Sequence, residues 1–171
     1  IVRIVADNPS PLTFKGTNTY LVGMTELAVI DPGPDLPAHL AAILGAVGTG
    51  QRISHILVTH AHGDHSPLAR RLAAATGAPV LAFGVDASFR PDATLADGAV
   101  VAGEGWTLRA LWTPGHMGNH LCFAWDDAVF SGDLVMGWST SLISPPDGDL
   151  TDFLASCRRL KAERPARLWP G

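Results

Sequence analysis

The sequence predicts an α/β fold in which two sheets pack face to face under helices on both outer sides, a four-layer αββα sandwich. Two observations favour this architecture. Strands and helices alternate over residues 27–83, and four strand-like segments then follow one another over residues 99–133. One doubly wound sheet is the less favoured alternative. With 171 residues, 47% of them hydrophobic, the chain is long enough for one core, so a single domain over 1–171 is expected.

Short apolar runs predict the elements of the first half. Residues 19–22 and 27–30 are β-type runs with Gly23 near the turn between them, so a hairpin is expected. A segment with helical spacing starts at Pro37, and "ISHILVTH" (53–60) is typical of a buried strand. The segment "SPLARRLAAATG" (66–77) predicts a helix capped by Ser66, and "PVLAF" (79–83) adds a strand.

The second half predicts a run of strands and a last helix. The strands are expected at 99–103, 106–114, 121–125 and 128–133, with Asp126 and Asp127 turning the last pair. A helix over 150–163 follows, and "ARLWPG" (166–171) ends as a strand entering a turn. The loop after Asp133 carries Met136 and Trp138 and is expected to wall a substrate pocket, with a packed surface loop as the alternative.

The overall composition limits the classes of function. A formal net charge of −4 offers no basic surface for nucleic acid or anionic membranes, so a small-molecule substrate is expected. The apolar runs are shorter than the roughly 20 residues of a membrane span. Two cysteines, Cys122 and Cys157, are too few for a disulfide-stapled domain and are predicted to be buried thiols, which favours a cytoplasmic location. Nothing in the sequence indicates an oligomeric state.

Five of the seven histidines lie in two short segments: "THAHGDH" holds His60, His62 and His65, and "TPGHMGNH" holds His116 and His120. His60 and His62 stand two apart at the end of a predicted strand, so the alternation of the strand points both rings to one side. Asp64 and His65 follow at the entry to a helix, where they can face a second ion about 3.5–4 Å from the first. Imidazole and carboxylate ligands suit zinc best, with iron or manganese as alternatives.

The segment "THAHGDH" resembles the HxHxDH signature of the metallo-β-lactamase fold superfamily. Further segments similar to the family follow in the expected order, namely "VIDPG", "TPGH", "SGD" and a final "LWPG", so the resemblance covers nearly the whole chain. The segments "NPSPLTFKGTNTYLVG" and "TPGHMGNHLCF" look closest to the lactamase-beta-2-like hydrolases, a subgroup with many bacterial members. The resemblance implies the four-layer fold and a metal-dependent hydrolase.

The resemblance also implies a dinuclear zinc site with six metal ligands: His60, His62, Asp64, His65, His116 and Asp133. His60, His62 and His116 would hold the first ion. Asp64 and His65 would lie on the second, and Asp133 would bridge the two.

Three further expectations concern residues around the metals. Asp31 would support a ligand histidine, with an ordinary turn aspartate as the alternative. His120 would hydrogen-bond substrate or product, or merely orient its loop. Two cations bridged by a carboxylate would bring the pKa of a shared water toward neutrality, so the expected nucleophile is hydroxide, and Asp64 would orient the water or accept its proton.

The end of the sequence departs from the family pattern. Family members continue the "PG" turn with a histidine that completes the second metal, whereas this sequence stops at Gly171. This predicts a fragment that lacks the family's last strand and helix and binds its second metal weakly.

The expected reaction is hydrolysis of an ester, thioester, lactone or phosphodiester. Zinc β-lactamases usually have Cys or Ser at the position of Asp133, so β-lactam hydrolysis is less favoured. The subgroup would imply an endoribonuclease, but the acidic balance of the chain disfavours RNA. A non-enzymatic metal-binding domain or an inactive fragment is the alternative from another class.

Overall fold

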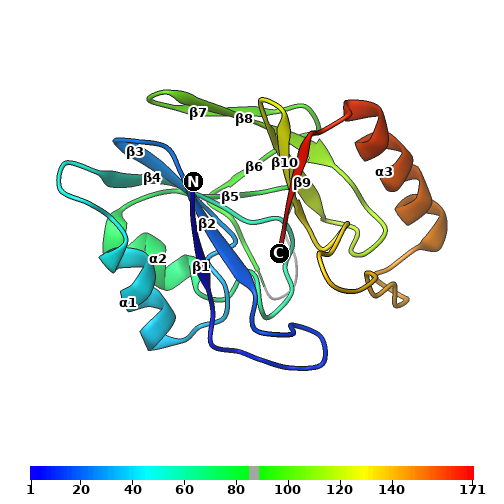
Figure 1. The fold of residues 1–171 in the computed structure, drawn as a ribbon, viewed down its shortest axis with the longest axis horizontal. Coiled ribbons are helices and arrows are strands. Elements are labelled where there is room, and N and C mark those ends of the chain that lie inside the picture. The colour runs from blue at the N-terminus through cyan, green and yellow to red at the C-terminus, as the bar shows by residue number, and fades with distance from the viewer. Residues whose placement is uncertain (85–88) are drawn as a thin grey trace.

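Residues 1–84 and 89–171 are described by a computed structural model, in which two β-sheets lie against each other between helices (Figure 1). The first sheet has six strands in the order β1 (Val2–Val5), β2 (Asn18–Val22), β3 (Glu26–Ile30), β4 (Arg52–Leu57), β5 (Val80–Ala82) and β6 (Ala93–Thr94). Strands β1 to β3 are antiparallel, which confirms the predicted β2–β3 hairpin, and β3 to β6 are parallel. Helices α1 (Pro37–Gly45) and α2 (Ala69–Thr76) connect β3 to β4 and β4 to β5.

The second sheet has the order β11-β10-β9-β8-β7. Its strands are β7 (Val100–Gly103), β8 (Trp106–Trp112), β9 (Leu121–Trp125), β10 (Ala128–Gly132) and β11 (Arg167–Pro170). The first four are antiparallel neighbours, as the sequence predicts, and Asp126 turns β9 into β10 with a φ of 50°. Helix α3 (Leu150–Glu163) has the predicted bounds and leads to β11, which pairs parallel with β10.

The layers follow the order of the predicted sandwich. Helices α1 and α2 lie on the outer side of the first sheet and α3 lies on the outer side of the second (Figure 1). The alternation of β3 explains how one strand serves two cores, because Leu27 and Val29 pack with Ile43 of α1, while Ile30 packs with Phe123 of the second sheet. The four-layer αββα fold is therefore confirmed.

A third apolar cluster joins the second sheet to α3. Cys122 on β9 is fully buried there, and burial raises the pKa of its thiol to about 12. Cys157 on α3 is only partly buried, so the prediction of two buried thiols holds for one of them. None of the helices in residues 1–84 and 89–171 has both the length and the apolar composition that a bilayer crossing requires.

Several local predictions differ from the structure. The helix predicted from Ser66 begins at Ala69, and the Ser66 hydroxyl donates instead to the backbone carbonyls of Ala61 and His62, at 3.1 and 3.3 Å. Ser66 therefore stabilises the turn before α2 rather than capping the helix. Strands β1 and β6 were not predicted, because edge strands of four and two residues are too short to show a periodic pattern.

Candidate metal centre

Three histidine rings surround one point beyond the end of β4. The Nδ1 atom of His62 lies 3.0 Å from Nε2 of His60 and 2.9 Å from Nε2 of His116. The planes of the three rings cross at 81–83°, so the rings enclose a common point instead of stacking. Together with Asp133, one ligand atom from each side chain lies within 4.8 Å of all the others.

The strand pleat predicted to aim His60 and His62 is absent, because β4 ends at Leu57. Backbone hydrogen bonds to neighbouring strands hold the segment instead. Val58 N–H donates to the carbonyl of Leu81, and the carbonyl of Thr59 accepts from the N–H of Leu121. The two rings thus meet through contacts with both sheets.

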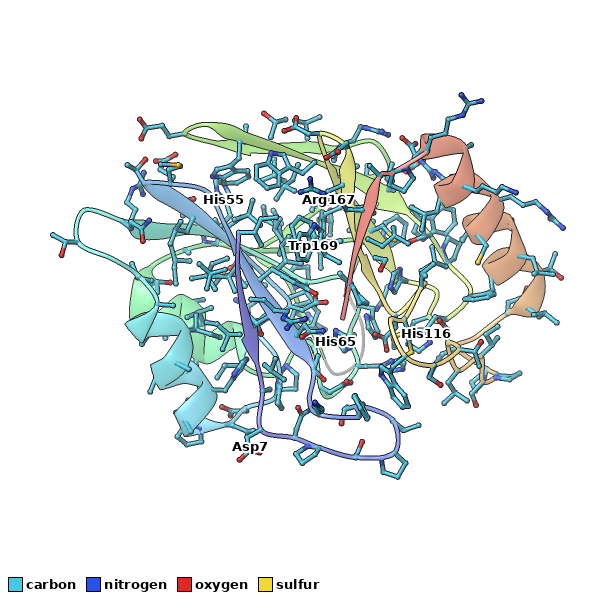
Figure 2. The ribbon with its side chains drawn as sticks, in the orientation of Figure 1. Asp7, His55, His65, His116, Arg167 and Trp169 are labelled. Carbon is cyan, nitrogen blue, oxygen red and sulfur yellow. The ribbon has the colours of Figure 1, made fainter. Side chains whose placement is uncertain are left out.

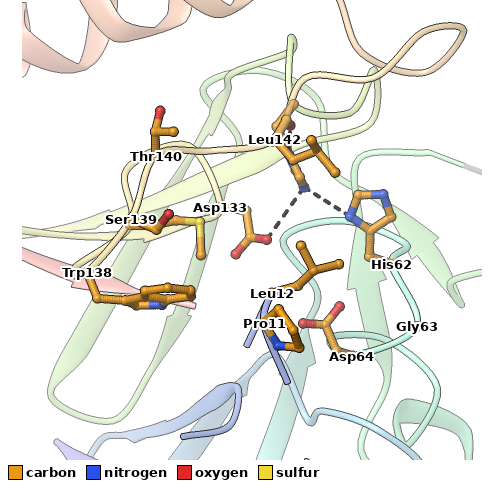
Figure 3. Close-up of a pocket in the computed structure, with 12 residues that line it drawn as sticks. Pro11, Leu12, His62, Gly63, Asp64, Asp133, Trp138, Ser139, Thr140 and Leu142 are labelled. Atoms are coloured by element: carbon orange, nitrogen blue, oxygen red, sulfur yellow. Dashed lines mark hydrogen bonds and ion pairs between the residues drawn. The ribbon is translucent and has the colours of Figure 1, made fainter. Parts of the chain in front are cut away.

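Asp133 follows β10 directly and contributes one oxygen to each of two groups. Its Oδ2 atom is 3.5 Å from Nε2 of His116 and 3.9 Å from Nε2 of His60. Its Oδ1 atom is 3.3 Å from Nε2 of His65, which is also 3.3 Å from Oδ2 of Asp64. In Figure 3, dashed lines mark the contacts that reach Asp133 and His62.

These distances fit metal coordination. Zinc–nitrogen bonds of 2.0–2.1 Å place two nitrogen ligands of a tetrahedral ion about 3.3 Å apart, close to the separations between the histidine nitrogens. The donor set, three imidazoles and a carboxylate in the first group and one imidazole with two carboxylates in the second, suits zinc, iron or manganese. The first group can therefore hold a divalent cation.

Asp31 fixes the orientation of two of the histidines. It is buried and accepts hydrogen bonds from Nδ1 of His65 at 2.9 Å and from the hydroxyl and N–H of Thr59, both at 2.7 Å. Because the Thr59 hydroxyl donates its proton to Asp31, it accepts from Nδ1 of His60 at 2.9 Å. The Nε2 atoms of His60 and His65 are thereby the atoms that would donate a lone pair to a metal. The expected support of a ligand histidine by Asp31 agrees with these contacts.

Other segments orient the remaining side chains. The Nδ1 atom of His116 lies 2.6 Å from the carbonyl of Leu142 and donates to it. The Thr17 hydroxyl donates to Oδ2 of Asp64 at 2.8 Å. No motif in the sequence predicts these roles of Thr17 and Thr59; the position of Thr59 beside His60 is the one signal for either role.

The charges of the cluster favour bound cations. Burial lowers the pKa of His60 well below its ordinary value and also lowers that of His62, so both rings are neutral at pH 7. Burial opposes the protonation of His65, but the carboxylates of Asp133 and Asp31 hold its pKa well above the ordinary value. Burial likewise opposes ionisation of Asp133, yet His65 beside it keeps the pKa of this carboxyl well below its usual range. A cation at Nε2 of His65 would take the place of a proton that the carboxylates stabilise.

The structure places His120, for which contact with substrate is one of two expected roles, among the buried residues and not among those that line the cavity. Its side chain is fully buried, and its Nε2 atom accepts the N–H of Asp133 at 3.2 Å. Its other nitrogen, Nδ1, lies 2.9 Å from the hydroxyl of Thr113 and donates to it, while burial lowers the pKa of His120 to about 3. A Cβ at Gly132 would lie 2.7 Å from the ring, so the glycine permits the close approach. His120 therefore contacts the backbone of Asp133, and both of its expected roles stay predictions.

A cavity of about 320 Å³ opens onto the cluster. The exposed edges of His62, Asp64, His116 and Asp133 line it together with apolar side chains from two loops. Figure 3 shows Trp138 beside Asp133, so the predicted pocket-wall role of its loop agrees with the structure. Figure 2 shows His65 and His116 near the same edge of the two sheets, where β11 also brings Gly171 against His65.

Comparisons with known proteins agree with this geometry. Residues 12–171 match the family described as the metallo-beta-lactamase superfamily. The lactamase-like protein nscB of Aspergillus fumigatus is 40% identical over 169 residues, which is 94% of this chain and 49% of the relative. The atrochrysone carboxyl ACP thioesterase dmxR1 of a Cryptosporiopsis species is 33% identical over 179 residues, 99% of this chain and 53% of the relative.

A solved structure, that of TTHA1623 in a di-iron-bound form, has a TM-score of 0.78 and 28% identity, covering 100% of this chain and 91% of the other. The chain spans about half the length of the curated relatives it matches. The family predicted from the histidine motif is confirmed. The chain belongs to the metallo-beta-lactamase superfamily.

Proposed function

We propose that this domain is a dinuclear metal-dependent hydrolase. His60, His62 and His116 hold one ion and Asp64 and His65 hold the other. The observation that carries the proposal is the position of Asp133, whose two oxygens face the two groups separately. A carboxylate placed in this way is suited to bridge two cations.

The metals and Asp64 have different roles in the proposed reaction. When bound, two cations would make a nucleophile available from water near neutral pH and would polarise the oxygen of the scissile group. Asp64 lines the cavity; burial opposes its ionisation, but His65 and then the Thr17 hydroxyl hold the pKa of its carboxyl below the ordinary value. An ionised Asp64 can orient a water or accept its proton.

The proposed metal is zinc, with iron and manganese as the other candidates. Nitrogen-rich coordination in the first group favours zinc. The likeness to a di-iron-bound protein supports iron at a site of this shape. Metal analysis of protein purified without added metal, followed by reconstitution with each metal, distinguishes the three.

Among substrates, we favour a thioester. This choice is supported by the thioesterase named among the relatives and by the carboxylate at position 133. Esters, lactones and phosphodiesters follow, and β-lactams are the least favoured class.

The test is turnover of a panel of these five substrate classes by metal-loaded protein. Wild type should cleave at least one class, and Asp64→Asn should lower kcat by about 10²-fold or more with an unchanged circular dichroism spectrum. Asp35→Asn, on the surface beside Arg71, is the matched control and should keep wild-type turnover. Two bound ions without turnover of any class would favour a non-enzymatic metal-binding domain instead.

A further inference from the structure

Two loops from distant parts of the sequence place apolar side chains over the opening of the metal centre. Leu12 comes from the segment between β1 and β2, and Met136, Trp138 and Leu142 come from the segment between β10 and α3. We call these four side chains the apolar wall. Figure 3 shows Leu12, Trp138 and Leu142 around Asp133.

The side chains of the apolar wall are not covered by the rest of the fold. Leu12 is 67% exposed, Leu142 is 56% exposed and Trp138 is 47% exposed. Contact between a group of large apolar side chains and water is unfavourable. An exposed apolar patch therefore marks a site where an apolar ligand or partner binds. A volume of about 320 Å³ with a polar floor and apolar sides is typical of a small-molecule site.

Hydrogen bonds fix the first loop relative to the metal centre. The hydroxyl of Ser10 accepts the N–H groups of Leu12 and Thr13, at 3.1 and 3.0 Å. At the end of the loop, the Thr17 hydroxyl donates to Asp64. The position of Leu12 is therefore set before any substrate arrives.

The second loop is fixed in the same way. The carbonyl of Leu142 accepts from His116, so the backbone of a wall residue also orients a metal-type histidine. The hydroxyl of Ser141 donates to the carbonyls of Asp133 and Leu134. Trp138 stacks on Phe14 of the first loop with ring centroids 5.2 Å apart, which joins the two loops across the opening. A preformed wall of this kind selects its ligand by shape and polarity.

From this arrangement we infer that the natural substrate carries an apolar acyl group directly on the scissile carbonyl, and that this acyl group lies against Leu12, Trp138 and Leu142. The inference rests on the proposed function, because it assumes that the carbonyl lies over Asp64 and Asp133. The polar floor then holds the carbonyl, while the acyl chain leaves water for the apolar wall. The leaving group points toward solvent.

A chain-length series measures the inference directly. Acetyl, butyryl and hexanoyl thioesters of one water-soluble thiol are compared with metal-loaded protein. Each methylene that enters the apolar wall should raise kcat/KM by up to about fourfold. A value of kcat/KM that stays level or falls from acetyl to hexanoyl would overturn the inference.

Variants of the apolar wall test whether these side chains cause the dependence on chain length. Leu12→Ser and Trp138→Ala should each reduce the hexanoyl-to-acetyl ratio of kcat/KM, and Trp138→Phe, which keeps an aromatic ring against Phe14, should give an intermediate ratio. Met24→Ser is the matched control for Leu12→Ser, because Met24 is 76% exposed and lies outside the cavity. An unchanged ratio in folded Leu12→Ser and Trp138→Ala proteins would contradict the assignment.

Binding of the product acids separates this inference from the proposed function. Calorimetry with acetate and hexanoate needs no turnover, and hexanoate should bind more tightly to wild type but not to Trp138→Ala. Turnover without a chain-length trend would refute the apolar wall and leave the hydrolase standing. Tighter binding of hexanoate without any turnover would refute the hydrolase and leave the apolar wall standing, whereas equal binding of both acids would refute the wall.

Discussion

Replacing Asp31 by Asn tests how the metal centre is oriented. Three donors converge on this carboxylate: Thr59 N–H on Oδ1, and the Thr59 hydroxyl and His65 Nδ1 on Oδ2. Asn offers one oxygen and one NH₂ group in the same shape. Because the backbone N–H of Thr59 cannot become an acceptor, the oxygen must face it and the NH₂ must face the other two. Asn also tolerates the φ of 49° at this position.

The consequence reaches both groups of metal-type residues. His65 must accept at Nδ1, so its proton moves to Nε2, the atom that faces Asp64 and Asp133. The Thr59 hydroxyl accepts from the amide and donates to Nδ1 of His60 instead, which moves the His60 proton to Nε2 as well. In each ring, Nε2 then carries a proton and has no lone pair for a metal.

The expected magnitude follows from the loss of such orienting partners, which typically costs about 10–100-fold in metal affinity. This corresponds to about 1.4–2.7 kcal/mol for an ion. Zinc titration against a competing chelator gives the affinity, and thermal unfolding of the metal-free variants shows whether the fold survives. Asp35→Asn is the control. Wild-type zinc affinity in a folded Asp31→Asn protein would refute the tautomer argument.

Three further outcomes are expected. His120→Ala removes the acceptor for the N–H of Asp133 and leaves a cavity. In denaturant titrations it should lower the free energy of unfolding by about 2–5 kcal/mol. A loss below about 1 kcal/mol would show that the ring is not needed for stability. At pH 8, a thiol reagent should modify Cys157 faster than buried Cys122, which should react only on unfolding; two equally fast thiols would contradict the packing. Burial lowers the pKa of His39, so the unfolded chain binds its proton first and stability falls as the pH drops below about 6.5. His39→Gln should therefore lose less stability than wild type between pH 7.5 and pH 5, and equal losses by thermal unfolding would exclude this contribution.

The sequence predicted the fold well because its signals are local. The apolar run of β3 and the two-residue turn at Asp126 act over a few neighbouring positions, and both appear in the structure. The short strands β1 and β6 gave no such signal, since pairing with β2 and β5 stabilises them. The Ser66 cap failed because its hydroxyl found two carbonyls in the preceding turn.

The predicted metal ligands meet in the structure because their short motifs are also local signals. The role of His120, in contrast, could not be predicted from its spacing in the sequence. His116 and His120 stand four residues apart in one short segment, yet one edge of His116 lines the cavity while His120 is fully buried. The difference depends on contacts with Thr113, Gly132 and the N–H of Asp133, which exist only when β8, β9 and β10 are paired. Spacing indicates which side chains can bind a metal; the partner of each second nitrogen decides which of them do so.

Three side chains of the candidate metal centre are held by residues from other segments. Asp31 after β3 orients His65, Thr17 before β2 holds Asp64, and the carbonyl of Leu142 holds His116. The unfolded chain has none of these contacts, so it cannot offer the same set of aligned lone pairs. Binding energy of a metal at this centre is therefore also folding energy. The same bonds that aim the ligands also fix the two loops of the apolar wall, so the position of the acyl group and the geometry of the metal centre are set by one hydrogen-bonded framework.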